Sequence, residues 1–301
     1  MNTMTSSTST SGLVQFDDNI ALRGCKFDLA AIKGIYKEFK RLTETEANRI
    51  VDQFTKPRRR KQSEFDAFKQ TTKESAFRVT ITIVGHDGAV HHGDSEQLFD
   101  SKDLPHPIKL IYFTNITAHR HMANGEMPPN HFQVWINFEK PALLDPSVFV
   151  SAPTPNASRV EIHGEELSYF RAAQSIAKTA FEKNRTSYEF LHRKFVYDLG
   201  LCFVALPYSL YMVTSLLDKI ELNDGPWKSF ELPLFLYGIG ISLVLYRILT
   251  SYLKWAFPVN VLAENKDRAM RHRVMIGGIF LALIVSMATS FLSQLSGIVS
   301  Q

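Results

Sequence analysis

The sequence predicts an α+β domain, built on a small and mainly antiparallel sheet with flanking helices, that is followed by an all-α bundle of three transmembrane helices. Three apolar runs occupy the C-terminal third, at residues 196–217, 230–251 and 274–298. An α-helix of about 20 residues crosses the roughly 30 Å hydrocarbon core of a bilayer. Between residues 77 and 163, several short stretches show the alternation of apolar and polar residues that is typical of strands. Helical spacing on both sides of these stretches completes the α+β pattern.

Composition divides the chain of 301 residues into four segments. The first residues are rich in Ser and Thr and resemble no signal sequence, so residues 1–17 are predicted to be a disordered tail. The other segments are predicted to be a cytosolic α+β domain (18–163), a linker helix (164–195) and a transmembrane domain (196–301). Two cysteines, Cys25 and Cys202, cannot form a disulfide framework, so nothing indicates an oxidising compartment.

Two helical pieces are predicted at the start of the α+β domain. Leu29, Ile32 and Phe39 recur at helical spacing. The sequence from Thr43 to Glu46 has the form of a capping box, which predicts that a second, short helix begins there. Strands are then expected at residues 77–83, 89–92, 108–113, 132–138 and 159–163, and long loops at 118–130 and 139–158.

The linker is predicted to be one long helix, or two nearly coaxial ones, that runs from the domain into the first membrane span. Glu165 and Glu166 lie in its expected first turn, where the helix dipole favours negative charge. From there to Gly200 no proline or glycine interrupts the sequence. Such a helix would link the domain mechanically to the membrane.

Charge around the apolar runs predicts the orientation in the membrane. Basic residues such as Arg193 and Lys194 precede the first run, and others such as Arg268 and Arg271 lie between the second and the third. The loop at residues 218–229 is slightly acidic. The positive-inside rule then places the N-terminal domain in the cytoplasm and the C-terminus outside, with the chain in the cell inner membrane.

A few residues inside the spans need a physical explanation. Asp198 and Arg247 lie at similar depth, so they could pair between antiparallel helices, or each could reach the headgroups separately. Pro207 would kink the first helix and free the carbonyl of Phe203. Glycines at 238, 240, 277 and 278 permit close approach of helices, either within one chain or between copies in a homo-oligomer.

No reactive site is predicted in the domain. Histidines cluster at positions 86, 91 and 92 and again at 119, 121 and 131, without the accompanying ligands of a typical metal site. We therefore expect them to be solvated, with no bound metal, no cofactor and no catalytic residue. Neither a nucleophile elbow nor a phosphate-binding glycine loop occurs.

One basic run is a candidate for binding a partner. It contains five cations, namely Lys56, Arg58, Arg59, Arg60 and Lys61. These side chains could contact nucleic-acid phosphates or anionic lipid headgroups, or they could form a solvated loop.

The overall plan resembles the small transmembrane effectors that bacteria encode in anti-phage systems, including those that accompany retrons. The resemblance covers the layout and rests on no residue-level motif. It implies a cytosolic protein or ribonucleoprotein partner, such as a reverse transcriptase with its nucleic acid, that restrains the domain. Release would let the spans interact with membrane lipids and damage the inner membrane in abortive infection. A passive membrane anchor and an accessory transporter subunit are the alternatives.

Overall fold

The computed structural model describes residues 15–143, 154, 156–193, 195–219, 229–265, 269–279, 282 and 286. The chain divides into two compact units. The sheet domain comprises Met1–Glu139, Asn156–Thr186 and Asn260–Asn265, and the helical unit comprises Lys140–Pro155, Ser187–Val259 and Lys266–Gln301.

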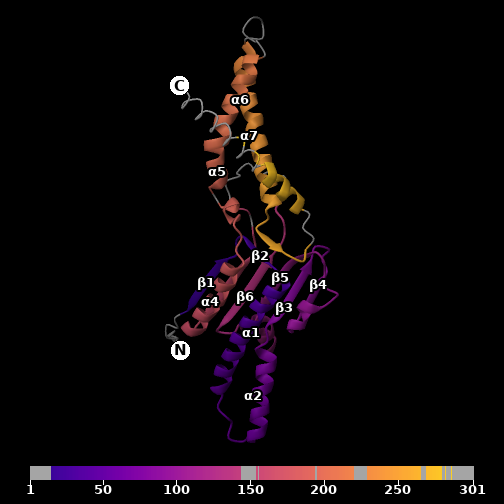
Figure 1. The fold of residues 1–301 in the computed structure, drawn as a ribbon. Helices are drawn as coiled ribbons and strands as arrows, with labels where there is room; N and C mark the ends of the chain where they lie inside the picture. The colour runs from indigo at the N-terminus through magenta and orange to yellow at the C-terminus, as the bar shows by residue number, and fades with distance from the viewer. Residues whose placement is uncertain are drawn as a thin grey trace, which may run out of the picture. The chain divides into compact units, whose positions relative to one another are not determined.

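The sheet domain contains a six-stranded sheet in the order β1-β7-β6-β5-β3-β4, with every neighbouring pair antiparallel (Figure 1). Its strands are β1 (Phe16–Ala21), β3 (Thr80–Gly85), β4 (Val90–Gly93), β5 (Ile108–Thr114), β6 (His131–Asn137) and β7 (Arg159–Gly164). The predicted antiparallel sheet with flanking helices is confirmed. β1 was not predicted, and it begins inside the segment that the sequence assigned to the tail.

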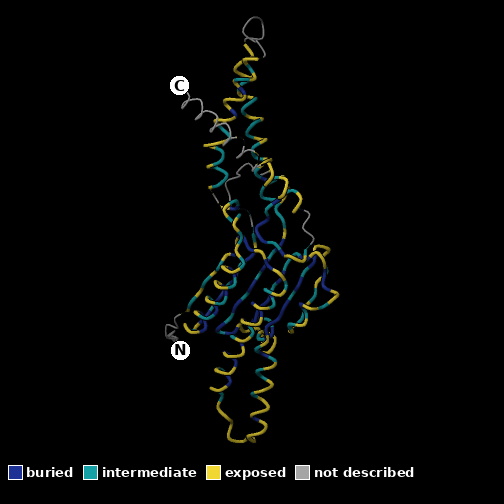
Figure 2. The backbone as a smooth tube through the Cα atoms, viewed as in Figure 1, coloured by how far each residue is buried: buried dark blue, intermediate teal, exposed yellow. Residues whose placement is uncertain are grey.

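Alternation of side chains gives the sheet one buried face and one open face. In β6, Phe132, Val134 and Ile136 are fully buried, whereas the residues between them are only partly buried. α1 (Leu29–Asp52) and α4 (Leu167–Lys183) carry buried apolar residues that join the same core as the strands (Figure 2). This arrangement is expected for an antiparallel sheet with helices on one side.

The prediction of two helical pieces at the start of the domain is wrong, because α1 is one helix of 24 residues. It begins after Asp28, whose Oδ1 accepts a hydrogen bond from the Ala31 amide at 2.6 Å. The Thr43 hydroxyl donates to the carbonyl of Phe39 at 2.9 Å instead of capping a new helix. Thr43 is buried, so packing keeps this threonine inside the helix.

Two further helices and a turn of 3-10 helix lie where the sequence predicted no regular structure. α2 (Gln62–Ala76) packs antiparallel to the end of α1, and the two form a helical hairpin that we call the arm (Figure 1). α3 (Ile116–Met122) overlaps the start of the loop predicted at 118–130, and η1 (Glu96–Asp100) follows β4. Residues 144–153 of the other predicted loop lie outside the described residues.

The prediction of one continuous helix from the domain into the first membrane span is wrong as well. α4 ends at Lys183, and the Asn184 side chain donates to the carbonyl of Ala180 at 2.7 Å. The Thr186 amide then donates to the carbonyl of Gly24 at 2.6 Å, which holds the chain against the start of β2 (Cys25–Phe27). A short 3-10 turn, η2 (Glu189–His192), and an extended Arg193 follow. These hydrogen bonds replace those of a continued helix, although no proline or glycine is present.

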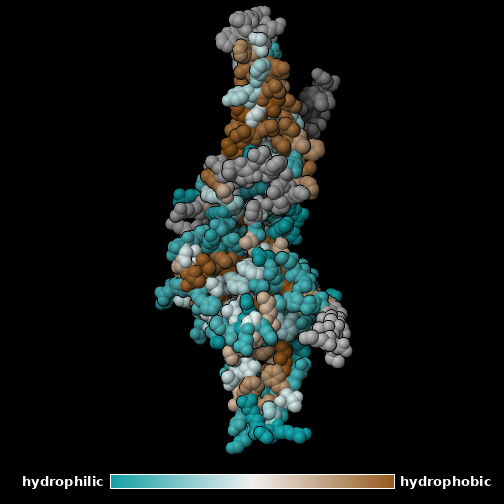
Figure 3. Space-filling view, turned by 180° about the vertical axis from the view of Figure 1, so that it is seen from behind, coloured by the Kyte–Doolittle hydropathy of each residue, from teal (hydrophilic) through white to brown (hydrophobic). Residues whose placement is uncertain are grey.

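The helical unit contains two long apolar helices. α5 (Val196–Gly200), η3 (Leu201–Ala205) and α6 (Leu206–Lys219) form one continuous helix of 24 residues, and α7 (Glu231–Ala256) has 26. Their most apolar windows have mean hydropathies of 1.6 and 1.8, with only 11% and 0% of the residues buried. Figure 3 shows this apolar surface in brown. A core helix of a soluble protein would be covered, so both helices are suited to a membrane.

The third predicted span begins in the described part of the chain. Residues 270–279 are helical, and most of the remainder up to residue 298 lies outside the described residues. The three-helix bundle therefore stays a prediction, whereas the described part of the chain contains two candidate membrane helices.

Candidate functional site

After α7 the chain returns to the sheet domain. Residues Asn260–Leu262 form β8, which pairs in parallel with β2. The Leu262 side chain is 1% exposed and belongs to the same hydrophobic core as the sheet and α1. We call Asn260–Asn265 the return segment. It completes the fold of a domain whose other residues precede the two apolar helices.

Asn260 anchors the return segment on one side. Its Oδ1 accepts a hydrogen bond from the Cys25 amide at 3.1 Å, and its Nδ2 donates to the Ser158 hydroxyl at 2.9 Å. Asn260, Cys25 and Ser158 are all buried. Buried polar groups are costly to leave without partners, so these bonds fix the position of β8.

Asn265 and Glu264 anchor the other end. Asn265 accepts from the Ile108 amide at 2.8 Å and donates to the Ile108 carbonyl at 2.7 Å, so its side chain satisfies both main-chain groups at the start of β5. The Glu264 carboxylate accepts from the Leu29 amide at 2.8 Å. That contact also places a negative charge at the positive end of the α1 dipole.

The return segment determines how the helices are connected. The chain leaves the sheet domain after Thr186 and enters it again at Asn260. Both ends of the helical hairpin formed by α5–α6 and α7 are therefore tied to one folded domain. A chain that crosses a membrane twice returns to the side from which it started. Two spans are therefore consistent with a chain that leaves the sheet domain and enters it again.

Close packing between the two helices depends on glycine. A Cβ atom added at Gly238 would lie 2.9 Å from Val213 Cγ1, whereas one added at Gly240 would meet nothing within 4 Å. At Gly200 an added Cβ would overlap the Tyr246 hydroxyl, which donates to the Tyr197 carbonyl at 3.0 Å. Gly238 thus serves packing within this chain.

Pro207 follows a wide turn of the first apolar helix. Residues Leu201–Ala205 form a π-helical turn, in which the Leu206 amide donates to the Leu201 carbonyl. Proline has no amide hydrogen, and its ring crowds the carbonyl four residues earlier, here that of Phe203. A single wide turn relieves this crowding, and such turns frequently occur at functional positions.

Asp198 and Arg247 lie at the same level of the hairpin. Their chain neighbours Tyr197 and Tyr246 pack with ring centroids 5.2 Å apart. The geometry is compatible with the predicted pair, and the pair itself stays a prediction.

Side chains also close the C-terminal end of α7. His192 is buried, and its Nε2 donates to the Phe257 carbonyl at 2.7 Å while its Nδ1 contacts the Thr154 hydroxyl at 3.0 Å. Burial lowers the pKa of His192. Arg273 Nε donates to the Ala256 carbonyl at 2.6 Å. Positive or polar donors here satisfy carbonyls that the helix leaves unpaired.

The open face of the sheet carries rows of cross-strand partners. Tyr112, Trp135 and Arg159 form one row, with the two rings 5.1 Å apart and the guanidinium 4.2 Å from the indole centroid. Arg159 also pairs with Glu161 at 2.6 Å. Because the row is closed by its own contacts, it stabilises the sheet and does not offer a free aromatic surface.

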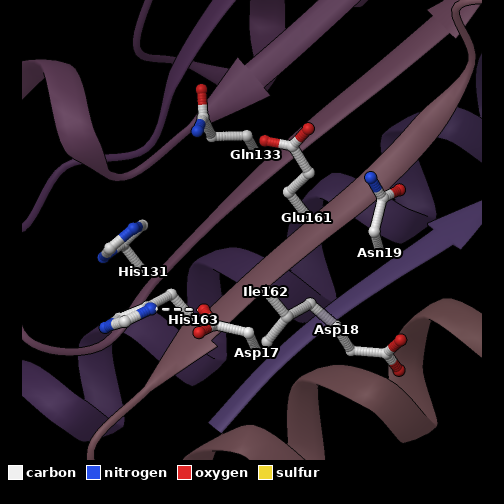
Figure 4. A pocket seen from close by; sticks show the side chains of 8 residues that line it. All are labelled: Asp17, Asp18, Asn19, His131, Gln133, Glu161, Ile162 and His163. Carbon is white, nitrogen blue, oxygen red and sulfur yellow. Dashed lines mark hydrogen bonds and ion pairs between the residues drawn. The ribbon is translucent and has the colours of Figure 1, made fainter. Parts of the chain in front are cut away.

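A polar recess lies beside this row. It is lined by Asp17, Asp18, Asn19, His131, Gln133, Glu161, Ile162 and His163 (Figure 4). The His131 and His163 rings are stacked with centroids 4.7 Å apart. His131 Nδ1 donates to the Pro128 carbonyl at 2.7 Å, and His163 Nδ1 donates to the Asp17 carboxylate.

The chemistry of the recess is limited by these bonds. Burial lowers the pKa of His131, which favours its neutral form. Within the described residues, no group of three or more His, Cys, Asp or Glu side chains is arranged to hold a metal ion. Sequence reasoning missed the contact of His131 with His163, because only the strand register brings them together.

The five predicted cations lie at the turn of the arm, between the end of α1 and the start of α2, and all are exposed.

Comparison with protein families, curated proteins and solved structures found no match for this chain.

Proposed function

We propose that the protein is a multi-pass effector of the cell inner membrane, whose cytoplasmic domain restrains its transmembrane helices until a signal releases them. Its output is a perturbation of membrane integrity, and it acts without a catalytic residue or a cofactor. By the resemblance of its layout, we place it in anti-phage defence by abortive infection, in a system such as a retron.

The return segment is the observation that carries this proposal. Leu262 lies in the domain core, and Asn260, Glu264 and Asn265 bond to β2, α1 and β5. Any rearrangement of those elements therefore acts on a segment that begins four residues after the end of α7. A helix that three residues join to a segment fixed in a core can be held in one arrangement and released in another.

A restraining partner would act on the domain. The resemblance implies a cytosolic protein or ribonucleoprotein, such as a reverse transcriptase with its nucleic acid, and homo-oligomers of the released helices are part of the proposal. The C-terminus lies on the outer side of the inner membrane if the third apolar run also spans it.

The alternative is a passive anchor, and the two functions make different predictions for cells. Strong expression of the full chain with the triggering signal present, with a membrane-potential dye as the readout, should give growth arrest with depolarisation if the protein is an effector. An anchor should leave the dye signal unchanged. An accessory transporter subunit should also leave it unchanged and should co-purify with other multi-span proteins.

A matched replacement tests which part produces the effect. Residues 196–256 are exchanged for an unrelated two-helix hairpin of the same length, which preserves both connections to the sheet domain. The effector proposal expects depolarisation to disappear while the protein remains in the membrane fraction. Depolarisation that survives the exchange would contradict a specific role for these helices.

A further inference from the structure

The arm is an appendage of the sheet domain. α1 continues beyond the sheet and packs there against α2, which contributes only Phe65 and Ala76 as fully buried residues. We call residues 55–64, which connect the two helices of the arm, the tip. Next to it, the Phe54 and Phe68 rings lie 6.2 Å apart, and the Arg60 guanidinium lies 4.9 Å from the Phe68 centroid. These few contacts order the tip, although the core of the sheet does not need it.

Positive charge is the main chemical feature of the tip. Of the six residues 56–61, five are basic and every one is exposed. Within the described residues, none of the five forms an ion pair with an acidic side chain. A turn that concentrates cations without acidic partners attracts polyanions.

The cations at the start of α2 are less favourable for the stability of this helix than other residues would be. Lys61 is the N-cap of α2, and its side chain makes no capping hydrogen bond. Ser, Thr, Asp or Asn would satisfy an amide there. Arg59, Arg60 and Lys61 also lie at the positive end of the α2 dipole, where cations are unfavourable. Such a local conflict is expected at functional positions.

The position and composition of the tip favour a soluble polyanion over lipid. α1 has 24 residues, so the tip lies roughly 36 Å along the helix from Leu29. Leu29 contacts the return segment, and Thr186, where the chain leaves the domain, bonds beside β2. The sequence from Thr55 to Glu64 contains no large apolar residue that could enter the headgroup layer.

We infer that the tip of the arm binds the phosphate backbone of a nucleic acid through Lys56, Arg58, Arg59, Arg60 and Lys61. The contact is independent of base sequence, because cations that bind phosphate oxygens do not read the edges of the bases. The inference deepens the proposed function, since it makes a nucleic-acid-bearing partner the ligand of the domain.

The test uses the full chain in phosphatidylcholine nanodiscs and the fluorescence anisotropy of a labelled DNA duplex and a labelled single-stranded RNA, each about 20 nucleotides long. The tip variant carries Arg58→Glu and Arg59→Glu. The control carries Arg171→Glu and Lys178→Glu, which make the same charge change at exposed positions of α4. We expect wild type and control to bind at least one of the two probes.

The binding constant of the tip variant should be lower by about tenfold or more at low salt. The slope of its logarithm against the logarithm of the salt concentration should fall in magnitude by about two. No binding by wild type, or an equal loss in tip variant and control, would overturn the inference. Nanodiscs that contain phosphatidylserine test the other source of phosphate. If residues 55–64 are protected from hydrogen exchange only in those nanodiscs, and no oligonucleotide binds, the tip binds lipid. That result would also overturn the inference.

Lys61→Ser distinguishes a role in binding from a role in folding. The substitution should raise the thermal stability of the chain and weaken oligonucleotide binding. If Lys61 did not contact the oligonucleotide, the substitution would change stability alone. Because binding is measured without membrane damage, a failure here is distinct from a failure of depolarisation in cells, which tests the proposed function.

Discussion

Asn265 and Ile108 are 157 residues apart in sequence, and the Asn265 side chain bonds both main-chain groups of Ile108, at 2.8 and 2.7 Å. An asparagine amide has one acceptor and one donor group, so it can act as a substitute strand partner. This relationship places the segment after α7 within the sheet domain. Asn265 is part-buried and lies outside the hydrophobic core, so its substitution removes this contact without changing the core.

Asn265→Ala should destabilise the sheet domain by about 1–3 kcal/mol, because the amide and carbonyl of Ile108 lose their partners in a part-buried position. Thermal unfolding of the detergent-solubilised full chain would measure the change. Asn48→Ala, at an exposed position of α1, is the matched control and should stay within about 0.5 kcal/mol. Equal effects of the two variants would refute the anchoring role of Asn265.

Stability should fall in mild acid through His192. Its pKa is lowered in the folded chain, so the unfolded chain takes up protons first as the pH drops below about 6.5. This contribution is complete above that pH and is lost progressively toward the lower pKa of the folded state. Unfolding midpoints between about pH 8 and about pH 5 would show it.

His192→Gln should reduce this acid sensitivity, although it also perturbs the bond to Phe257. His131 has a lowered pKa as well, so His131→Asn in the same series separates the two sites. If the slope of stability against pH is the same in wild type and both variants, burial of these histidines does not control it.

Gly238→Ala and Gly240→Ala form a matched pair within one helix. The first should cost about 1–3 kcal/mol, since its Cβ would press on Val213, and the second should be neutral or stabilising because the space beside it is open. Thermal unfolding in detergent compares them. A larger cost at Gly240 would favour contacts with another copy over the packing described for this hairpin.

Lys61→Ser should stabilise α2 by about 1 kcal/mol, since serine supplies the missing cap bond. Lys102→Ser, at an exposed position outside the helices, controls for loss of one charge and should change little. If the unfolding midpoint of Lys61→Ser is no higher than that of the control, the main-chain amides at the start of α2 already have hydrogen-bond partners in wild type.

Elements with strong local periodicity were predictable from the sequence. β6 alternates cleanly, and the two apolar helices are long enough to be found by composition alone. α1 was split in error, because Thr43 and Glu46 match a capping box, yet both are buried in the middle of a helix. Tertiary packing decides such positions, and local sequence does not record it.

The return segment and the end of α4 could not be predicted in the same way. β8 has three residues in a charged connector, and its partner strand lies 235 residues earlier. The break after Lys183 depends on bonds from Asn184 and Thr186 to distant carbonyls and amides. Only Asn260 and Asn265, two amides flanking a short apolar stretch, hinted at a structured connector.

The central claim is that the return segment restrains the membrane helices, and Leu262→Asp tests it most directly. The charge cannot remain in the domain core, so β8 should detach while α7 stays intact. Val261→Asp, one residue earlier at a partly exposed position, is the control. Membrane potential is measured in cells at matched levels of membrane-inserted protein, without any inducing signal. We predict depolarisation with Leu262→Asp and a normal potential with Val261→Asp, and a normal potential in both would contradict the account.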